Sequence, residues 1–329
     1  MTSHPTRRHV VLSLSAAAAL PLGAMAQNKQ ALTFLAVGDW GRDGAFHQQD
    51  VADQMGKAAD ALSPAFVVSV GDNFYEDGVT GVDDPMWRSS FEQVYKAPSL
   101  QVPWYVALGN HDYHGNAQAQ IDYSQKSTRW RMPSRWFSFS RTAPDGARAD
   151  FFVLDTSPFI KKYYEDGGQK VKITGQDTAA QLAWIDQALG ASDADWKIVI
   201  GHHPIFSGGK PDPSGQNVPK DKEEDMPGGS VELKAQLDPI LQRHGVPLYL
   251  NGHDHDLQHV FNGGTHYVCT GAGSKTRTHC DMAGSDFCSM QPGFIACAID
   301  RKRINLVYSD FTGAQLHVVD IARHSDPKA

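Results

Sequence analysis

The chain has 329 residues, of which 41% are hydrophobic, and its 30 Lys and Arg against 37 Asp and Glu give a formal net charge of -7. This apolar content is enough for one large domain or two ordinary ones. The acidic balance gives no electrostatic reason to expect binding to nucleic acid or to an anionic membrane. A site for phosphate groups would therefore need local positive centres, such as metal ions held by some of the 15 His.

The first 26 residues predict an export signal. Arg7-Arg8 precedes an apolar run from Val10 to about Leu22, and the small-residue cleavage site Ala24-Met25-Ala26 follows. The run is shorter than the roughly 20 residues of a membrane-spanning helix, so we expect cleavage near Ala26 rather than an anchor. The twin arginines favour export of the folded protein, with ordinary secretion of the unfolded chain as the alternative. Either route predicts a periplasmic or secreted protein.

Short apolar strands alternate with amphipathic helices after this signal. In the first half we expect strands at Leu32 to Val37, Phe66 to Val70 and Trp104 to Leu108, and helices around Gln48 to Ala61 and Met86 to Val94. In the second half we expect strands at 151–154, 197–200, 247–250, 267–270, 294–299, 304–309 and 315–320, and helices around 177–189 and 233–244. Such alternation is typical of an α/β protein, and the second half closes in strands alone.

No linker rich in Gly, Ser or Pro divides the two halves. We therefore predict a single domain over residues 27–323, built as a two-sheet sandwich of mixed strands flanked by helices in four layers, αββα, with a tail at 324–329. The stretch from Ser207 to Ser230 is rich in Gly and Pro and too polar for the core. It is either a flexible surface loop or a lid over the active site.

The four cysteines, Cys269, Cys280, Cys288 and Cys297, lie close together in the sequence. Export into an oxidising compartment makes disulfides the expected state, and three connectivities are open. Because Cys269 and Cys297 sit on strand-like runs, we favour a nested pairing, 269 with 297 and 280 with 288, that staples a local hairpin. A zinc site is the competing interpretation, disfavoured because no C-x-x-C pair is present.

Five polar clusters each follow an apolar strand through a glycine. They are Gly38-Asp39-Trp40-Gly41, Gly71-Asp72-Asn73-Phe74-Tyr75, Gly109-Asn110-His111-Asp112, Gly201-His202-His203-Pro204 and Gly252-His253-Asp254-His255. Loops at the carboxyl ends of strands commonly build sites, and glycine permits the tight turn that brings a short side chain back over the strand end. One such cluster is usually only a turn, but five in the same setting predict a shared site.

The side chains of these clusters offer carboxylate, amide, phenol and imidazole donors, which suit Fe, Mn or Zn and not a thiolate site. Seven such donors are too many for one ion, whereas one carboxylate can bridge two ions roughly 3.5 Å apart, as in two-metal hydrolases. A serine or cysteine hydrolase is disfavoured, because no G-x-S-x-G motif is present and the cysteines lie apart from the histidines.

The five clusters resemble those of the metallophosphoesterase superfamily, and their details resemble the purple acid phosphatases of the small, mammalian-like, tartrate-resistant kind, from about Leu32 to Asp320. The superfamily's first block is Asp-x-His, but here Asp39-Trp40-Gly41 lacks the histidine. Tyr75, three residues after Asp72, is where purple acid phosphatases carry the tyrosinate that binds ferric iron. The missing His and the added Tyr therefore both indicate Fe(III).

The resemblance implies a ligand set of seven residues. Ferric iron would be bound by Asp39, Tyr75 and His255, a divalent ion (Fe, Zn or Mn) by Asn110, His202 and His253, and Asp72 would bridge the two. The resemblance also places His111 near the substrate phosphate and the leaving group, and we expect Asp112 to orient His111 through a hydrogen bond.

The chain departs from mammalian-like members at two places. It has His203 where they carry Tyr, and Tyr113, followed by His114, where they carry His. His203 and His114 are candidate contacts to substrate phosphate, with solvent-facing loop residues as the alternative. The chain also lacks the cysteine pair of the mammalian relatives in its long loops.

The implied reaction is in-line attack on phosphorus by a hydroxide held on the metals, with protonation of the leaving group by His111. We therefore predict a monomeric acid phosphatase for small phosphate monoesters, with no nucleic-acid partner and no membrane contact after signal removal. A phosphodiesterase or nucleotide hydrolase on the same site is the nearest alternative. A non-catalytic exported metal-binding protein is a more remote one.

Overall fold

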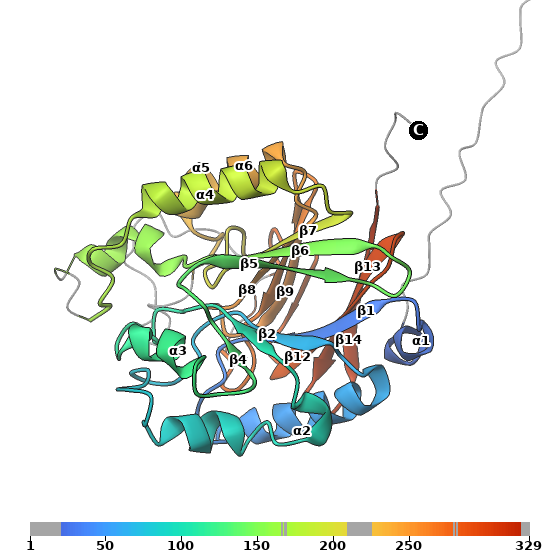
Figure 1. The fold of residues 1–329 in the computed structure, drawn as a ribbon, viewed down its shortest axis with the longest axis horizontal. Helices are drawn as coiled ribbons and strands as arrows, with labels where there is room; N and C mark the ends of the chain where they lie inside the picture. The colour runs from blue at the N-terminus through green and yellow to red at the C-terminus, as the bar shows by residue number, and fades with distance from the viewer. Residues whose placement is uncertain are drawn as a thin grey trace, which may run out of the picture.

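The computed structural model describes residues 21–323, apart from 166, 168–169, 209–225, 279 and 281. Its centre is a pair of mixed seven-stranded sheets, with strand orders β14-β13-β12-β1-β2-β3-β4 and β11-β9-β10-β8-β7-β6-β5. Helices cover the outer faces, α2 on one side and α4 to α6 on the other (Figure 1). The predicted two-sheet α/β architecture is confirmed.

The first sheet contains the strands that open and close the described chain. Its members are β1 (Leu32–Val37), β2 (Phe66–Ser69), β3 (Trp104–Val106), β4 (Trp130–Arg131), β12 (Gly293–Ile299), β13 (Arg303–Asp310) and β14 (Gln315–Ala322). The second sheet holds β5 (Phe137–Thr142), β6 (Arg148–Val153), β7 (Trp196–Ile200), β8 (Leu248–Asn251), β9 (Leu257–Asn262), β10 (Thr265–Thr270) and β11 (Phe287–Ser289). All ten expected strands are present, whereas β4, β5, β9 and β11 were not expected.

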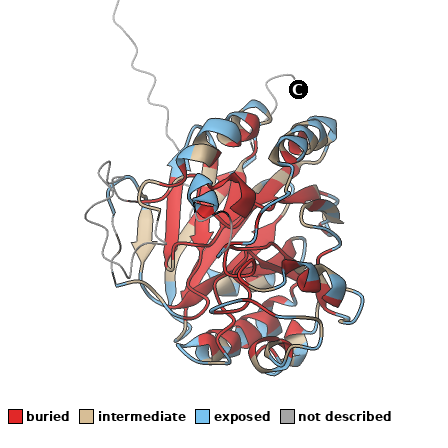
Figure 2. Ribbon diagram, turned by 90° about the vertical axis from the view of Figure 1, so that its left-hand side faces the viewer, coloured by how far each residue is buried: buried red, intermediate tan, exposed pale blue. Residues whose placement is uncertain are grey.

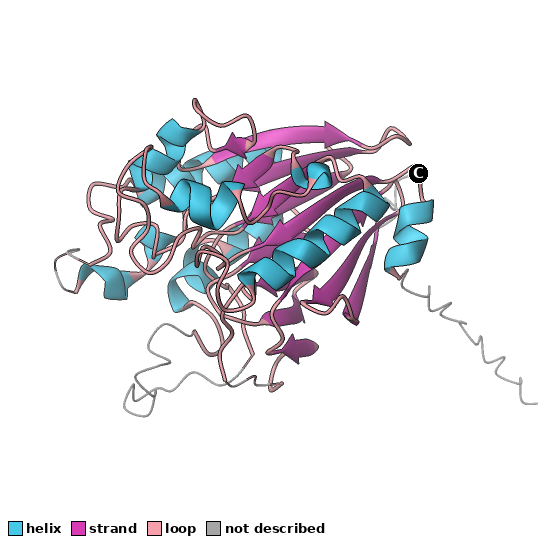
Figure 3. Cartoon of the chain, turned by 90° about the horizontal axis from the view of Figure 1, so that it is seen from below, coloured by secondary structure: helices cyan, strands magenta, loops and turns pink. Residues whose placement is uncertain are grey.

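Short helices connect the strands and lie outside the sheets, with most of the loops gathered at one end of the strands (Figure 3). They are α1 (Leu22–Gln27), α2 (Gln48–Leu62), a turn of π-helix at Trp87–Glu92, α3 (Ala117–Tyr123), α4 (Thr178–Ala191), α5 (Val231–Gln236), α6 (Asp238–Arg243) and 3₁₀ turns at Pro98–Leu100, Ser157–Phe159 and Lys161–Tyr164. The single helix expected over 233–244 is two, α5 and α6. Pro239 in the first turn of α6 has no backbone N–H to continue the hydrogen-bond ladder of α5.

The core lies between the two sheets, where aromatic rings from both meet. Phe34 of β1 stacks on Phe66 of β2 at 4.9 Å between ring centroids, and both meet the edge of Phe151 of β6. Every residue of β1, β2 and β8 is buried, and the central strands form the buried middle of the molecule (Figure 2). The strands that carry the polar clusters are therefore firmly held.

The N-terminal predictions stay predictions. Residues 1–20, with Arg7-Arg8 and most of the apolar run, lie outside the described residues. The expected cleavage site falls within α1, whose Met25 is 1% exposed. No helix in the described part of the chain is long and apolar enough to cross a membrane. Most of the Ser207 to Ser230 stretch and the tail at 324–329 also lie outside the described residues, so the choice between surface loop and lid remains open.

The cysteine prediction is half right. Cys280 and Cys288 form a disulfide, but Cys269 and Cys297 are buried free thiols. The expected 269–297 bond is wrong because β10 and β12, on which they lie, belong to different sheets and form no hairpin. The thiol of Cys269 instead faces backbone carbonyls, with Sγ 3.3 Å from the carbonyl oxygen of Asp254.

Candidate active site

The five polar clusters follow β1, β2, β3, β7 and β8, and so come from both sheets. All five strand ends converge, so that the seven expected ligand residues form one continuous group of contacts. Two sets of side chains have donor atoms close enough to share a metal ion: Asp39 with Asp72 and His255, and His202 and His253 together with His203, which is not one of the seven.

The backbone at these strand ends is unusual. Asp39, Asp72 and His253 each follow a glycine and have positive φ angles of 60°, 48° and 71°. Non-glycine residues seldom adopt this left-handed conformation, which costs on the order of 1–3 kcal/mol per residue and is typical of functional sites. The tight turn thus falls on the candidate ligand itself. Nearby glycines provide room, since a Cβ on Gly109 would lie 2.1 Å from Oδ1 of Asp72.

The first half of the site is centred on the hydroxyl of Tyr75. This oxygen lies 3.0 Å from Oδ1 of Asp39, 3.0 Å from Oδ2 of Asp72 and 2.9 Å from Nε2 of His255. The guanidinium of Arg42 stacks on the Tyr75 ring at 3.6 Å from its centroid. Burial, and then the two carboxylates, raise the pKa of the Tyr75 phenol well above its usual value.

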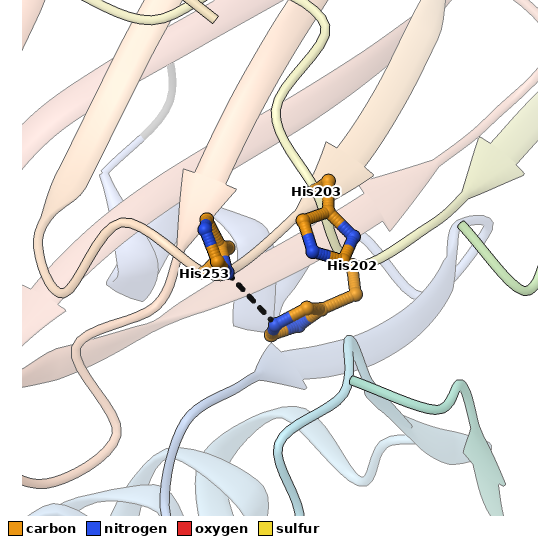
Figure 4. A group of neighbouring side chains, drawn as sticks. All are labelled: His202, His203 and His253. Carbon is orange, nitrogen blue, oxygen red and sulfur yellow. Dashed lines mark hydrogen bonds between the residues drawn. The ribbon is translucent and has the colours of Figure 1, made fainter. Parts of the chain in front are cut away.

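The second half contains an amide and two imidazoles. Oδ1 of Asn110 lies 3.2 Å from Nε2 of His202 and 2.9 Å from Nδ1 of His253, and these two ring nitrogens are 3.3 Å apart (Figure 4). Nδ1 of His202 lies 3.0 Å from the carbonyl oxygen of Val70, which can only accept a hydrogen bond. Nδ1 therefore carries the hydrogen, and Nε2 is directed into the site, as in metal-binding histidines.

Asp72 joins the two halves. Its Oδ2 is 3.0 Å from the Tyr75 hydroxyl and also 3.4 Å from Nε2 of His202. Burial raises the pKa of the neighbouring Asp39, whereas for Asp72 the charges of His202 and His111 outweigh burial and lower it. Two buried carboxylates this close need positive charge between them. The oxygen and nitrogen donors and their buried charge therefore fit a pair of cations.

His111 lies beside the first half, against the face of Tyr75 at 4.4 Å between ring centroids. Its backbone N–H donates to Oδ1 of Asp72 at 2.8 Å, and its Nδ1 is 2.5 Å from the carbonyl oxygen of Glu76. The hydrogen bond expected between Asp112 and the His111 ring is not among those that Asp112 makes in the described structure. Its buried carboxylate instead accepts from the backbone of Asn73 and Gly109 and from the side chains of Asn73 and Gln120. Asp112 thus braces the two loops that carry Asp72 and His111.

His203 is fully buried. Its Nδ1 lies 2.9 Å from the hydroxyl of Thr156 and its Nε2 lies 2.9 Å from the hydroxyl of Tyr163, so both ring nitrogens have partners. Its ring packs against His253 at 4.4 Å between centroids, and burial lowers its pKa well below the usual value. This environment gives His203 the contacts of a packing residue rather than those of a phosphate ligand.

His114 lies next to His111, with 4.8 Å between ring centroids. Its Nδ1 is 3.2 Å from the same Glu76 carbonyl oxygen, and its Nε2 has no hydrogen-bond partner among the described residues. Burial, and then the charge of His111, lower the pKa of His114. This Nε2 is itself buried, so the contact of His114 with substrate stays a prediction.

The sequence analysis missed Thr156, whose hydroxyl accepts hydrogen bonds from the backbone N–H groups of His202 and His203 at 3.1 and 3.0 Å. A signal was present, since Asp155-Thr156 lies one residue beyond the end of β6, the neighbour of β7. The cluster was overlooked because no glycine precedes it.

Comparisons with known proteins agree with this geometry. Residues 32–257 match the family described as calcineurin-like phosphoesterase. Purple acid phosphatase 7 of Arabidopsis thaliana is 37% identical over 89% of this chain and 87% of its own, and human tartrate-resistant acid phosphatase type 5 is 31% identical over 90% and 93%.

Solved structures agree in fold. The GAP50 anchor of the Plasmodium inner membrane complex superposes with a TM-score of 0.74 at 24% identity, covering 90% of each chain. A purple acid phosphatase from yellow lupin gives a TM-score of 0.61 at 17% identity, covering 89% of this chain and 54% of its own. These two likenesses concern the fold alone, whereas the matches in sequence decide the family. The chain belongs to the calcineurin-like phosphoesterase family of hydrolases and, within it, to the purple acid phosphatases.

Proposed function

We propose that this protein is an acid phosphatase that hydrolyses small phosphate monoesters at a dinuclear metal centre. The observation that carries the proposal is the position of Asp72, whose Oδ2 lies within 3.4 Å of both Tyr75 on one side and His202 on the other. A carboxylate shared by two sets of donors is the arrangement that two adjacent ions require.

The proposed ligands divide between two ions. One ion is held by Asp39, Tyr75 and His255, the other by Asn110, His202 and His253, and Asp72 is shared. The phenolate of Tyr75 would be a hard, anionic oxygen donor, which favours Fe(III) over a divalent ion beside it. The second ion is divalent: Fe, Zn or Mn. When bound, such a pair would neutralise phosphate oxygens and lower the pKa of a nucleophilic water.

His111 is the proposed proton donor to the leaving group. Because the carbonyl of Glu76 can only accept, Nδ1 of His111 carries a hydrogen, and Nε2 is the proposed atom that exchanges a proton with substrate. General acid catalysis of this kind typically contributes about 10²–10⁴-fold. Asp112 contributes by holding the loop, and His114 is the proposed neighbour that contacts phosphate.

Substrate would reach the site from the side of His255. The His255 side chain is 18% exposed, whereas Asp39 and His202 are fully buried. A phosphate group that enters there meets His255, Tyr75 and His111 before the deeper residues.

Metal content, the visible spectrum and the hydrolysis of phosphate esters together decide the proposal. The purified protein should contain two metal ions per chain, show a visible absorption band that Tyr75→Phe removes, and hydrolyse p-nitrophenyl phosphate at acid pH. A colourless, fully active dizinc protein would contradict the iron assignment alone, and a protein that binds no metal would contradict the whole proposal. Faster hydrolysis of bis-p-nitrophenyl phosphate would indicate a phosphodiesterase. Bound metal without turnover would indicate a binding protein, since the fold is also that of the GAP50 anchor.

We also propose that the protein acts outside the cytoplasm, as a monomer. The Cys280–Cys288 disulfide supports an oxidising compartment, because such bonds seldom persist in the cytosol. N-terminal sequencing of the exported protein tests cleavage near Ala26, and its mass in solution tests the monomer.

A further inference from the structure

Three buried charged residues form a group at the loop that carries His253 and His255: Asp254 and Asp256 belong to this loop, and Arg277 contacts both. Both carboxylates are fully buried, and the Arg277 side chain is 10% exposed. The Arg277 guanidinium pairs with Oδ2 of Asp256, and its Nη1 is 3.7 Å from Oδ2 of Asp254. We call these three residues the Arg277 cluster. It contains none of the proposed metal ligands.

Successive side chains of this loop point alternately toward the proposed metal site and toward Arg277. In His253-Asp254-His255-Asp256 the imidazoles belong to the metal site, whereas the carboxylates contact Arg277. Close backbone hydrogen bonds hold this alternation, with Asp254 N–H donating to Gly252 at 2.9 Å and Asp256 N–H donating to Asp254 at 2.7 Å. A shift of either carboxylate would therefore move the imidazole next to it.

Arg277 also holds the loop through its backbone, because its N–H donates to the carbonyl oxygen of His255 at 3.0 Å. Three residues earlier on the same segment, the hydroxyl of Ser274 donates to the carbonyl oxygen of Asp39 at 2.6 Å. The segment from Ser274 to Arg277 thus contacts two residues proposed to bind the same ion. These two residues come from different sheets, after β1 and β8.

Further contacts fix the cluster in place. Asp256 accepts from Gln258 Nε2 at 2.7 Å and lies 3.3 Å from the sulfur of Cys288. Asp254 accepts from the hydroxyl of Ser207 and from the backbone N–H of Met226, on either side of residues 209–225. Without the guanidinium, the two buried carboxyl groups would lack their cation, so one of them would have to lose its charge or move, and either change would disturb the loop.

We propose that Arg277 is a positioning residue that holds His255 in the geometry needed to bind the first ion. The inference rests on the proposed function, because it takes His255 as a metal ligand. Residues that orient metal ligands typically contribute about 10–100-fold in metal affinity. Arg277→Met should therefore lower the affinity for metal by about that factor, beyond any loss of stability.

The chain offers a matched control in Arg129. Its side chain is 3% exposed, pairs with Glu92 at 2.6 Å and donates to the carbonyl oxygen of Tyr95 at 2.8 Å. It is buried even more deeply than Arg277 and also pairs with a carboxylate, but none of its described contacts is to a proposed ligand. Arg129→Met should lower the melting temperature and leave the metal affinity unchanged.

The experiment uses the full chain loaded with iron and zinc. Wild type, Arg277→Met, Arg277→Lys and Arg129→Met are titrated with EDTA, retained metal is measured by elemental analysis, and melting is followed by circular dichroism. We expect Arg277→Met to release metal at about 10–100-fold lower EDTA than wild type, and Arg277→Lys to lie between them, since lysine keeps the charge but cannot reach both carboxylates. If Arg277→Met does not fold, Arg277→Lys carries the test.

A double variant with His255→Ala separates positioning from general stability. If Arg277 acts through His255, adding Arg277→Met to His255→Ala should lower the metal affinity no further. Full additivity, or equal metal retention in the Arg277 and Arg129 variants, would overturn the inference. A wild-type protein that binds no metal would instead refute the proposed function, so the two failures are distinguishable.

Discussion

Gly109→Ala is the sharpest steric test of the site. A Cβ on Gly109 would lie 2.1 Å from Oδ1, 2.3 Å from the backbone nitrogen and 2.7 Å from Cγ of Asp72. All three contacts are far inside van der Waals distance, and one is to backbone, so a side-chain rotation cannot relieve them. Asp72, already at a φ of 48°, would have to move.

The structure indicates the size of the effect. Relief of the closest contact needs a displacement of about 1 Å, and overpacking in a dense interior costs about 1–3 kcal/mol. A 1 Å misplacement in an active site can reduce the rate by about 10²-fold. We therefore expect Gly109→Ala to lower kcat on p-nitrophenyl phosphate by about two orders of magnitude and to lower the metal content, with a modest fall in melting temperature.

Gly81→Ala is the control, since nothing lies within 4 Å of a Cβ placed there and its φ is not in the left-handed range. It should change the free energy of unfolding by less than about 0.5 kcal/mol and leave kcat unchanged. Wild-type kcat and metal content in Gly109→Ala would refute the argument that the glycine makes room for the shared carboxylate.

Three further predictions concern the leaving group, the disulfide and pH. His111→Ala should reduce hydrolysis of alkyl phosphates by about 10²–10⁴-fold but of activated aryl phosphates much less, because a good leaving group needs no proton; equal losses in steady-state assays would count against the role as proton donor. Replacing Cys280 and Cys288 by serine should lower the free energy of unfolding by about 2.5 kcal/mol in urea titrations, from the loop entropy of a bond with a sequence separation of 8; no change would mean that the bond is absent in solution. Burial lowers the pKa of His259 and of His266, the latter from the usual 6.5 to about 4. The folded state thus favours the neutral ring of His266. The contribution of this ring to the free energy of unfolding is complete above pH 6.5 and is lost as the pH falls toward 4. His266→Gln should make the free energy of unfolding less dependent on pH in that window, and an unchanged slope would contradict it.

The candidate ligands could be predicted from the sequence because each obeys a local rule. Asp39, Asp72 and His253 stand directly after a glycine at the end of a fully buried strand, and such strand ends converge in α/β folds. The rule needs no knowledge of which sheet a strand joins. It therefore predicts that the clusters lie together even though they come from two different sheets.

Predictions that depended on pairing were less successful. The expected bond between Cys269 and Cys297 assumed a hairpin, but sequence proximity does not reveal that their strands belong to different sheets. The expected contact between Asp112 and His111 assumed that neighbours in sequence interact, whereas Asp112 faces the loop after β2 and Gln120 of α3. Edge strands such as β4, with two residues, carry too little pattern to be recognised.

The difference between local sequence rules and long-range packing also explains how the folded protein can hold a site with strained backbone and buried charges. Left-handed backbone at Asp39, Asp72 and His253 costs on the order of 1–3 kcal/mol for each residue, and burial of carboxylates adds to that cost. The charges of His202 and His111 offset the burial of Asp72 locally. The strain of the backbone is offset by β1, β2 and β8, which are buried at every position and stabilise the fold through contacts across both sheets. The local rule therefore identifies residues that converge at the site, but their geometry exists only because distant strands pack together, and residues such as Arg277 can be recognised only in the folded structure.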